Sequence, residues 1–204
     1  MKKFTILFSL VFIIACNSQD KRPLLGETEY QQELNASYKD ASKSPLKTKD
    51  LKNFKGLDFF PVDATFIVTA KLTKTANAPT FEMATTTDRK PLYKEYGILS
   101  FTLKGKECNL TIYQSQDDLR DEKYKDYLFL PFTDDTSGNE SYGGGRYMDV
   151  MTTDEKPDGT IQLNFNNTYN PYCAYNDKYS CPLTPRKNHL DLEIKAGVKV
   201  FKKH

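Results

Sequence analysis

Histidine is scarce in this chain, and lysine and arginine never gather into a block. The sequence has two histidines, and because His204 is terminal, any mechanism based on histidine would have to use His189. Proteins that bind nucleic acids neutralise phosphates with clustered positive charge. Because the chain has no basic block, we do not expect it to bind a nucleic-acid partner.

A long hydrophobic run occurs once, at the start of the chain. Lys2 and Lys3 precede an apolar stretch over residues 4–15 that stops at Cys16, which predicts a signal peptide over residues 1–15. The stretch is shorter than the roughly 20 residues that a membrane-spanning helix requires. No second run is long enough to cross a membrane.

Residues 13–16, with the sequence IIAC, resemble a bacterial lipobox, in which cleavage precedes a lipidated cysteine. We therefore predict that Cys16 carries lipid, that residues 16–26 form a tether, and that the protein contacts a membrane through this anchor. The expected location is the cell envelope, facing the periplasm or the cell surface. Cleavage by the general signal peptidase, with Cys16 incidental, is the alternative. Removal of residues 1–15 takes away two lysines and leaves 27 basic and 27 acidic residues.

Residues 27–204 predict a single β-rich domain that begins with one helix. Tyr30, Leu34 and Tyr38 recur at a spacing of four, which favours an amphipathic helix over residues 27–41. Residues 43–63 are predicted to be a loop packed on the domain. Beyond Asp63 apolar and polar residues alternate, and the predicted strands are ATFIVTAKLTK, FEMATTT, YGILSFTLKG, KECNLTIYQ, YLFLPF, TIQLNF, LDLEIKA and VKVF. The predicted fold is mainly β, an antiparallel sandwich or partly closed barrel with one N-terminal amphipathic helix.

Three cysteines follow Cys16. Cys108 alternates in phase with neighbouring apolar residues and is predicted to be a small core residue, the alternative being a third thiol near the other two. Cys173 and Cys181 lie in a loop rich in tyrosine and proline, and an oxidising compartment predicts a disulfide between them. A zinc site with His189 and a thiol nucleophile with His189 as base remain alternatives.

Three blocks of the sequence together resemble a bacterial family known as domain of unknown function 1684. They are FKGLDFFPVD from Phe54, LPFTDDTSGNESYGGGRYMDV from Leu130 and NFNNTYNPYCAYNDKYSCPLTPRKNHL from Asn164. The likeness spans roughly residue 27 to the C-terminus. The resemblance implies no known activity.

The second block holds most of the candidate ligand-binding residues. Consecutive glycines at 143–145 allow a close backbone approach, and Arg146 would close on an anion held there. The alternative is that the glycines form a bend entering a strand and that Arg146 pairs internally with Glu140 or Asp149. The candidate ligand-binding residues are Asp134, Glu140, Tyr142, Gly144, Arg146, Tyr147, Asp149 and Tyr172.

Two functions are consistent with these features. The first is an envelope lipoprotein without catalysis, which binds a small molecule or an envelope partner through a face rich in glycine and tyrosine; the chain has 13 tyrosines. The second is an envelope hydrolase in which Arg146 binds substrate charge and Glu140, Asp149 or Tyr142 acts as acid or base. An enzyme would need a perturbed carboxylate in a cleft. We expect no cofactor and no metal.

Overall fold

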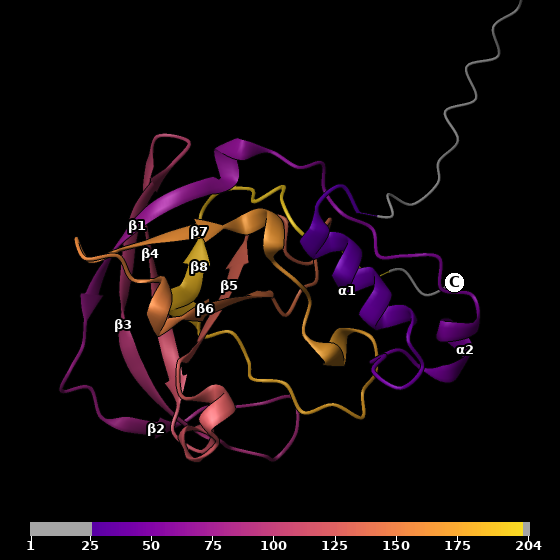
Figure 1. Ribbon diagram of the computed structural model, residues 1–204, viewed down its shortest axis with the longest axis horizontal. Helices are drawn as coiled ribbons and strands as arrows, with labels where there is room; N and C mark the ends of the chain where they lie inside the picture. The colour runs from indigo at the N-terminus through magenta and orange to yellow at the C-terminus, as the bar shows by residue number, and fades with distance from the viewer. Residues whose placement is uncertain (1–25, 202–204) are drawn as a thin grey trace, which may run out of the picture.

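The computed structural model describes residues 26–201, and their strands form one curled sheet (Figure 1). The order is β6-β5-β4-β3-β1-β7, with β2 paired to β3 and β8 paired to β5. The pairings are antiparallel except for the parallel pair of β5 and β8. The strands are β1 (Ile67–Lys74), β2 (Thr80–Glu82), β3 (Leu92–Leu103), β4 (Lys106–Ser115), β5 (Tyr127–Asp134), β6 (Arg146–Met151), β7 (Thr160–Asn164) and β8 (His189–Leu190). The prediction of a mainly β, antiparallel fold is confirmed, and of its two alternatives, a sandwich or a partly closed barrel, the structure has the second.

A bulge in β3 helps to curl the sheet. The register between β3 and β4 shifts between Glu95 and Gly97, and such a bulge bends a strand and increases its twist. Gly97 also allows β1 to approach closely, because a Cβ built on it would lie 2.7 Å from the Leu72 side chain and 2.8 Å from the Thr73 carbonyl oxygen. The glycine therefore stands where β3 bends against β1.

The main hydrophobic core fills the concave side of the curled sheet. Alternate residues of the long strands point into it, among them Leu99 and Phe101 from β3 and Leu110 and Ile112 from β4. Cys108 is 5% exposed and belongs to this core, so its predicted role is confirmed. The period of two in the sequence thus corresponds to one face of a sheet.

The C-terminal segment differs from the prediction of two further strands. Strand β8 has only two residues, and beyond it Ile194, Ala196 and Val198 are buried in alternation without forming a ladder. Backbone groups of this segment bond to separate parts of the fold: the Phe60 N–H donates to the Gly197 carbonyl, and the Val198 N–H donates to the Thr168 carbonyl. Alternating apolar residues indicate that one side of an extended chain is buried. They do not indicate that the chain pairs with a neighbouring strand.

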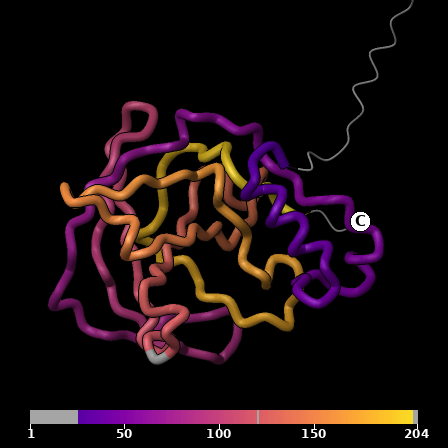
Figure 2. Tube along the Cα trace, in the orientation of Figure 1, coloured from indigo at the N-terminus to yellow at the C-terminus, as the bar shows by residue number. Residues whose placement is uncertain are grey.

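Helix α1 (Glu29–Lys39) confirms the predicted N-terminal helix, and Thr28 caps it by accepting from the Gln31 N–H. A second, short helix, α2 (Thr48–Lys52), lies in the segment that was predicted to be a loop. Tyr38 of α1 is buried against Tyr175, and Figure 2 shows the helix beside the loop of residues 169–182. No helix within residues 26–201 is long and apolar enough to span a membrane. The predicted signal peptide, Cys16 and nearly all of the tether lie outside the described residues.

Candidate functional site

Strand β6 separates the predicted site residues onto two faces. Arg146 points into the main core with Met148 and Val150, whereas Tyr147 and Asp149 lie on the opposite face. Successive side chains of a strand alternate between the faces of a sheet. Arg146 and Asp149 therefore cannot contact one small ligand from the same side.

Arg146 is a buried structural residue in this fold. Its side chain is 0% exposed, its Nη2 lies 2.8 Å from Asp134 Oδ2, and its guanidinium also donates to the carbonyls of Ile194 and Ala196. Burial lowers the pKa of Arg146, and the charge of Asp134 opposes that effect. The guanidinium thus joins β6 and β5 to the C-terminal segment and is not exposed to an anion. Its internal partner is Asp134 and not Glu140 or Asp149, the partners considered in the alternative reading.

Three other predicted residues contact separate neighbours. Glu140 pairs with Lys195 at 3.1 Å, the Tyr142 hydroxyl lies 4.0 Å from Cys173 Sγ, and the Gly144 carbonyl accepts from the Thr184 hydroxyl at 3.0 Å. None of these three candidates lines the large pocket described next. The structure does not bring Glu140, Tyr142, Arg146 and Asp149 together as one hydrolytic centre.

A pocket of about 550 Å³ lies where α1, the outer face of β5 and β6, and the loop of residues 169–182 meet. We call it the tyrosine pocket because eight tyrosines line it. Its volume is within the range of small-ligand sites in proteins. The lining residues are Tyr30, Glu33, Leu34, Tyr38, Tyr93, Tyr127, Phe129, Tyr147, Asp149, Tyr169, Pro171, Tyr172, Tyr179, Ser180, Cys181 and Pro182.

Asp149 is held in a fixed position inside the tyrosine pocket. Its Oδ1 accepts hydrogen bonds from the hydroxyls of Tyr127 at 2.8 Å and Tyr169 at 2.5 Å. Burial raises the pKa of both tyrosines well above the usual value, and the negative charge of Asp149 adds to the shift. The two phenols therefore remain protonated donors to the carboxylate at physiological pH.

The aromatic walls of the pocket contain two rows of rings in contact. In the first row Phe129 meets Tyr147 at 4.6 Å between ring centroids, and Tyr147 meets Tyr169 at 6.0 Å, both nearly at right angles. In the second row Tyr172 lies 5.2 Å from Tyr179. Edge-to-face packing, as in the first row, is favourable beyond simple burial, so these contacts stabilise that wall of the pocket.

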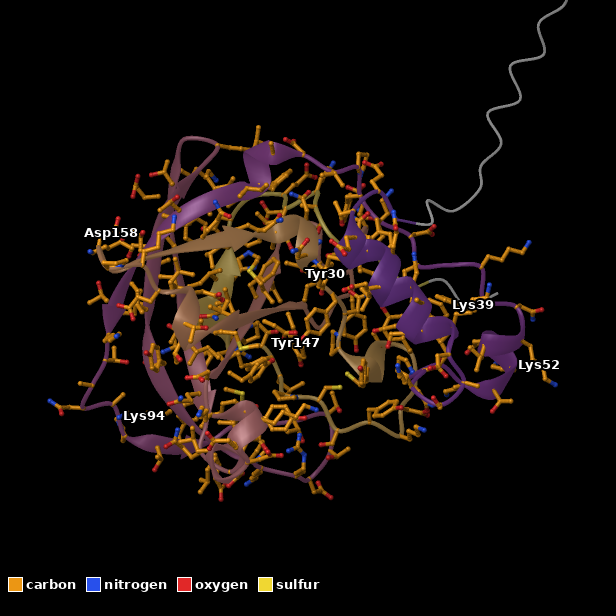
Figure 3. All side chains as sticks on the ribbon, viewed as in Figure 1. Tyr30, Lys39, Lys52, Lys94, Tyr147 and Asp158 are labelled. Carbon is orange, nitrogen blue, oxygen red and sulfur yellow. The ribbon has the colours of Figure 1, made fainter. Side chains whose placement is uncertain are left out.

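Segments far apart in the sequence build these walls. Figure 3 shows Tyr30 of α1 and Tyr147 of β6 in the region between the helix and the sheet. The loop of residues 169–182 is attached to β6 by a bridge between Tyr147 and Tyr169, and the Tyr147 hydroxyl donates to the Pro182 carbonyl. The loop that carries Cys173 and Cys181 thus lies on the same surface as the strand that follows the glycines at 143–145.

Cys173 and Cys181 are adjacent but are free thiols in this structure, so it does not show the predicted disulfide. The Cys173 N–H donates to Cys181 Sγ at 3.1 Å. A hydrogen bond from the Cys181 thiol lowers the pKa of Cys173 to about 7. His189 lies near Thr133, Asp135 and Asp191, and residues 26–201 contain no group of three His, Cys, Asp or Glu suited to hold a metal ion.

Sequence reasoning found part of this pocket. Of the eight candidates, Tyr147, Asp149 and Tyr172 line it. It missed the tyrosines of α1 and of β5, although their signals were present: Tyr30, Leu34 and Tyr38 share one helical face. Tyr127 begins the alternating segment YLFLPF. No sequence pattern showed that these faces meet.

Comparisons with known proteins give a family but no activity. The model of a family described as "Protein of unknown function (DUF1684)" matches residues 52–199. The solution NMR structure of an uncharacterized protein of Haloarcula marismortui is similar, with 34% identity and a TM-score of 0.66, over 85% of this chain and 92% of that one. A search of curated proteins finds no match. Because the family match begins at residue 52, the wall that α1 supplies lies outside it.

Proposed function

This chain belongs to the family of proteins of unknown function DUF1684, and from the geometry of its pocket we propose that it binds a small organic ligand in the tyrosine pocket. The observation that supports the proposal most is the exposed Asp149 carboxylate, anchored by two phenols inside a cavity of about 550 Å³. Binding sites typically combine apolar walls with a few oriented polar groups. The tyrosine pocket has this composition.

The alternative of a hydrolase has less support. It requires a group that binds substrate charge beside an acid or a base, and Arg146 is buried on the face of β6 opposite Asp149. Glu140 pairs with Lys195 away from the pocket. Binding without catalysis therefore explains the arrangement with fewer assumptions.

Removal of one pocket wall tests the proposal. We expect Tyr172→Ala to weaken binding of any compound that occupies the tyrosine pocket by about tenfold, because one aromatic contact contributes on the order of 1 kcal/mol or more. Compounds of neutral, cationic and anionic classes are screened on the purified full chain by the shift in melting temperature, and affinities of the hits are measured by calorimetry.

Tyr96→Ala is the matched control, because Tyr96 is a half-buried tyrosine that does not line the pocket. It should leave affinity unchanged. A hit that both variants bind as tightly as the wild type would lie elsewhere, and a screen with no hit in any class would contradict a small-ligand site.

We also propose that the domain works at a membrane of the cell envelope, anchored by lipid on Cys16. The support is the sequence of residues 1–16 alone. In a host that processes lipoproteins, labelled palmitate should enter the wild-type protein and be absent from Cys16→Ala. Label that persists in the variant would exclude this attachment site.

A disulfide between Cys173 and Cys181 is the third part of the proposal. The short distance from the Cys173 N–H to Cys181 Sγ supports it, as does the lowered pKa of Cys173, because the thiolate is the form that reacts. Cys181 lines the tyrosine pocket, so the bridge would fix the loop that carries Tyr172 and Tyr179.

The bridge is tested by counting thiols in the exported protein. We expect one alkylatable thiol after unfolding, Cys108, and two more after reduction. Replacement of both bridged cysteines by Ser should lower the free energy of unfolding by roughly 2 to 3 kcal/mol, as expected from closing a loop of this size. Three alkylatable thiols without reduction would refute the disulfide.

A further inference from the structure

The charged residues that line the tyrosine pocket favour one class of ligand. The two charged residues that line it, Asp149 and Glu33, are both acidic, and no lysine, arginine or histidine is among the described residues of its lining. An anionic ligand would meet like charge from both side chains. The pocket is therefore electrostatically suited to a positive charge.

Two basic side chains contact residues of the lining without being part of it. Arg89 donates to the hydroxyl and the carbonyl of Ser180 at 3.1 and 3.0 Å. Lys178 lies over the Tyr179 ring, 4.9 Å from its centroid. These contacts hold the loop, and neither cation is paired with Asp149 or Glu33 in the described residues.

One oxygen of Asp149 remains for a ligand. Both phenols donate to Oδ1, and none of the hydrogen bonds or ion pairs within residues 26–201 uses Oδ2. The residue is exposed, although its neighbours Met148 and Val150 are buried. The carboxylate is thus oriented by the protein and still accessible from the pocket.

The negative charge of Asp149 acts on tyrosines in several walls of the pocket. The charge of Asp149 contributes to the raised pKa of Tyr30 on α1 and of Tyr172 in the loop, after burial as the larger cause at both. It does the same at Tyr127 and Tyr169. A cation placed among these rings would feel both the carboxylate and the aromatic groups.

From these contacts we propose that the ligand is a small organic cation of the quaternary or highly alkylated ammonium class; the inference rests on the proposed function of the pocket. Aromatic rings attract such cations through their quadrupoles, and clusters of aromatic residues recognise quaternary ammonium groups. A quaternary ammonium ion has no N–H to satisfy. It therefore fits walls of eight tyrosines with a single anchored carboxylate.

The test separates charge from shape. Binding of choline to the purified full chain is compared by calorimetry with binding of 3,3-dimethylbutan-1-ol, in which carbon replaces the nitrogen and the charge is absent. We expect choline to bind at least about tenfold more tightly, since each cation–π contact contributes on the order of 0.5 to 2 kcal/mol. Asp149→Asn keeps the shape of the side chain and an oxygen for the phenols, and it should lower choline affinity about tenfold with little change for the alcohol.

Asp191→Asn is the matched control, because it removes one negative charge from a side chain that is 90% exposed and outside the pocket. It should leave choline affinity unchanged. Tyr172→Leu provides a second variant, which keeps the carboxylate and should weaken choline more than the alcohol. Melting temperatures of all variants show whether each is folded.

The outcomes distinguish the inference from the proposed function. Equal binding of choline and the alcohol, or insensitivity to Asp149→Asn in a folded protein, would overturn the cationic ligand. If sugars or anions bind instead, and their binding depends on Tyr172, the cationic ligand is also overturned, but the pocket remains a binding site. If no compound is found whose binding depends on Tyr172, both the cationic ligand and the proposed binding function are overturned.

Discussion

Asp134→Ala is expected to lower the free energy of unfolding by about 3 to 5 kcal/mol, the range found when one partner of a buried ion pair is removed. Asp134 Oδ2 accepts from Arg146, and Oδ1 accepts from the Thr136 hydroxyl at 2.6 Å and the Ile194 N–H at 3.1 Å. The variant leaves the Arg146 guanidinium buried without its counter-charge. It also removes the acceptor that holds the C-terminal segment.

Asp135→Ala is the control for this variant. Asp135 is the next residue, its side chain is 50% exposed, and its ionic neighbour is the exposed His189 at 3.7 Å. Exposed pairs contribute about 0 to 1 kcal/mol, so the expected loss is small. The free energy of unfolding of both variants is measured with denaturant. Equal losses of this free energy in the two variants would contradict a structural role for the Arg146–Asp134 pair.

Gly197→Ala is expected to destabilise the protein by about 2 to 5 kcal/mol through two effects that add, left-handed backbone strain and overpacking. Gly197 has a φ of +75°, and a Cβ there would lie 2.1 Å from the Thr168 hydroxyl oxygen and 2.7 Å from the Thr168 carbonyl oxygen. The Gly197 carbonyl also accepts from the Phe60 N–H, so a backbone shift would break that bond.

Gly105→Ala separates the two effects. Gly105 has a nearly equal φ of +78°, but a Cβ there would meet no atom within 4 Å. Its substitution should cost only the strain of a left-handed conformation, about 1 to 2 kcal/mol. If the two variants unfold at the same denaturant concentration, the close contact of Gly197 with Thr168 is not present in solution.

Local patterns predicted the elements of the fold well. The alternation of Leu99, Phe101, Leu110 and Ile112 became one face of β3 and β4, and the spacing of the tyrosines in residues 27–41 became α1. These patterns succeed because they report which side of an element is buried. They failed in three places. Strand β2 has three residues where a strand of seven was predicted, and β6 was not among the predicted strands. After β8 an extended segment buries alternate residues against several elements and forms no strand of its own.

The candidate site was harder to predict because it depends on which faces meet. Arg146 and Asp149 are three residues apart and were assigned to one site, yet alternation along β6 directs one to the core and the other to the pocket. Treating residues 146–151 as a strand would have separated them. Nothing in the sequence places Tyr30 and Tyr38 of α1 beside the loop of residues 169–182, since that contact is made only by the complete fold.

The central claim is that an organic cation binds among the rings of the tyrosine pocket. Its most direct test is the measurement of intermolecular nuclear Overhauser effects between the methyl protons of tetramethylammonium and assigned tyrosine ring protons of the full chain. We expect effects to the rings of Tyr169 and Tyr172, and their loss in Asp149→Asn. Effects confined to a tyrosine outside the pocket, such as the exposed Tyr124, or none at a saturating concentration of the ion, would contradict the claim.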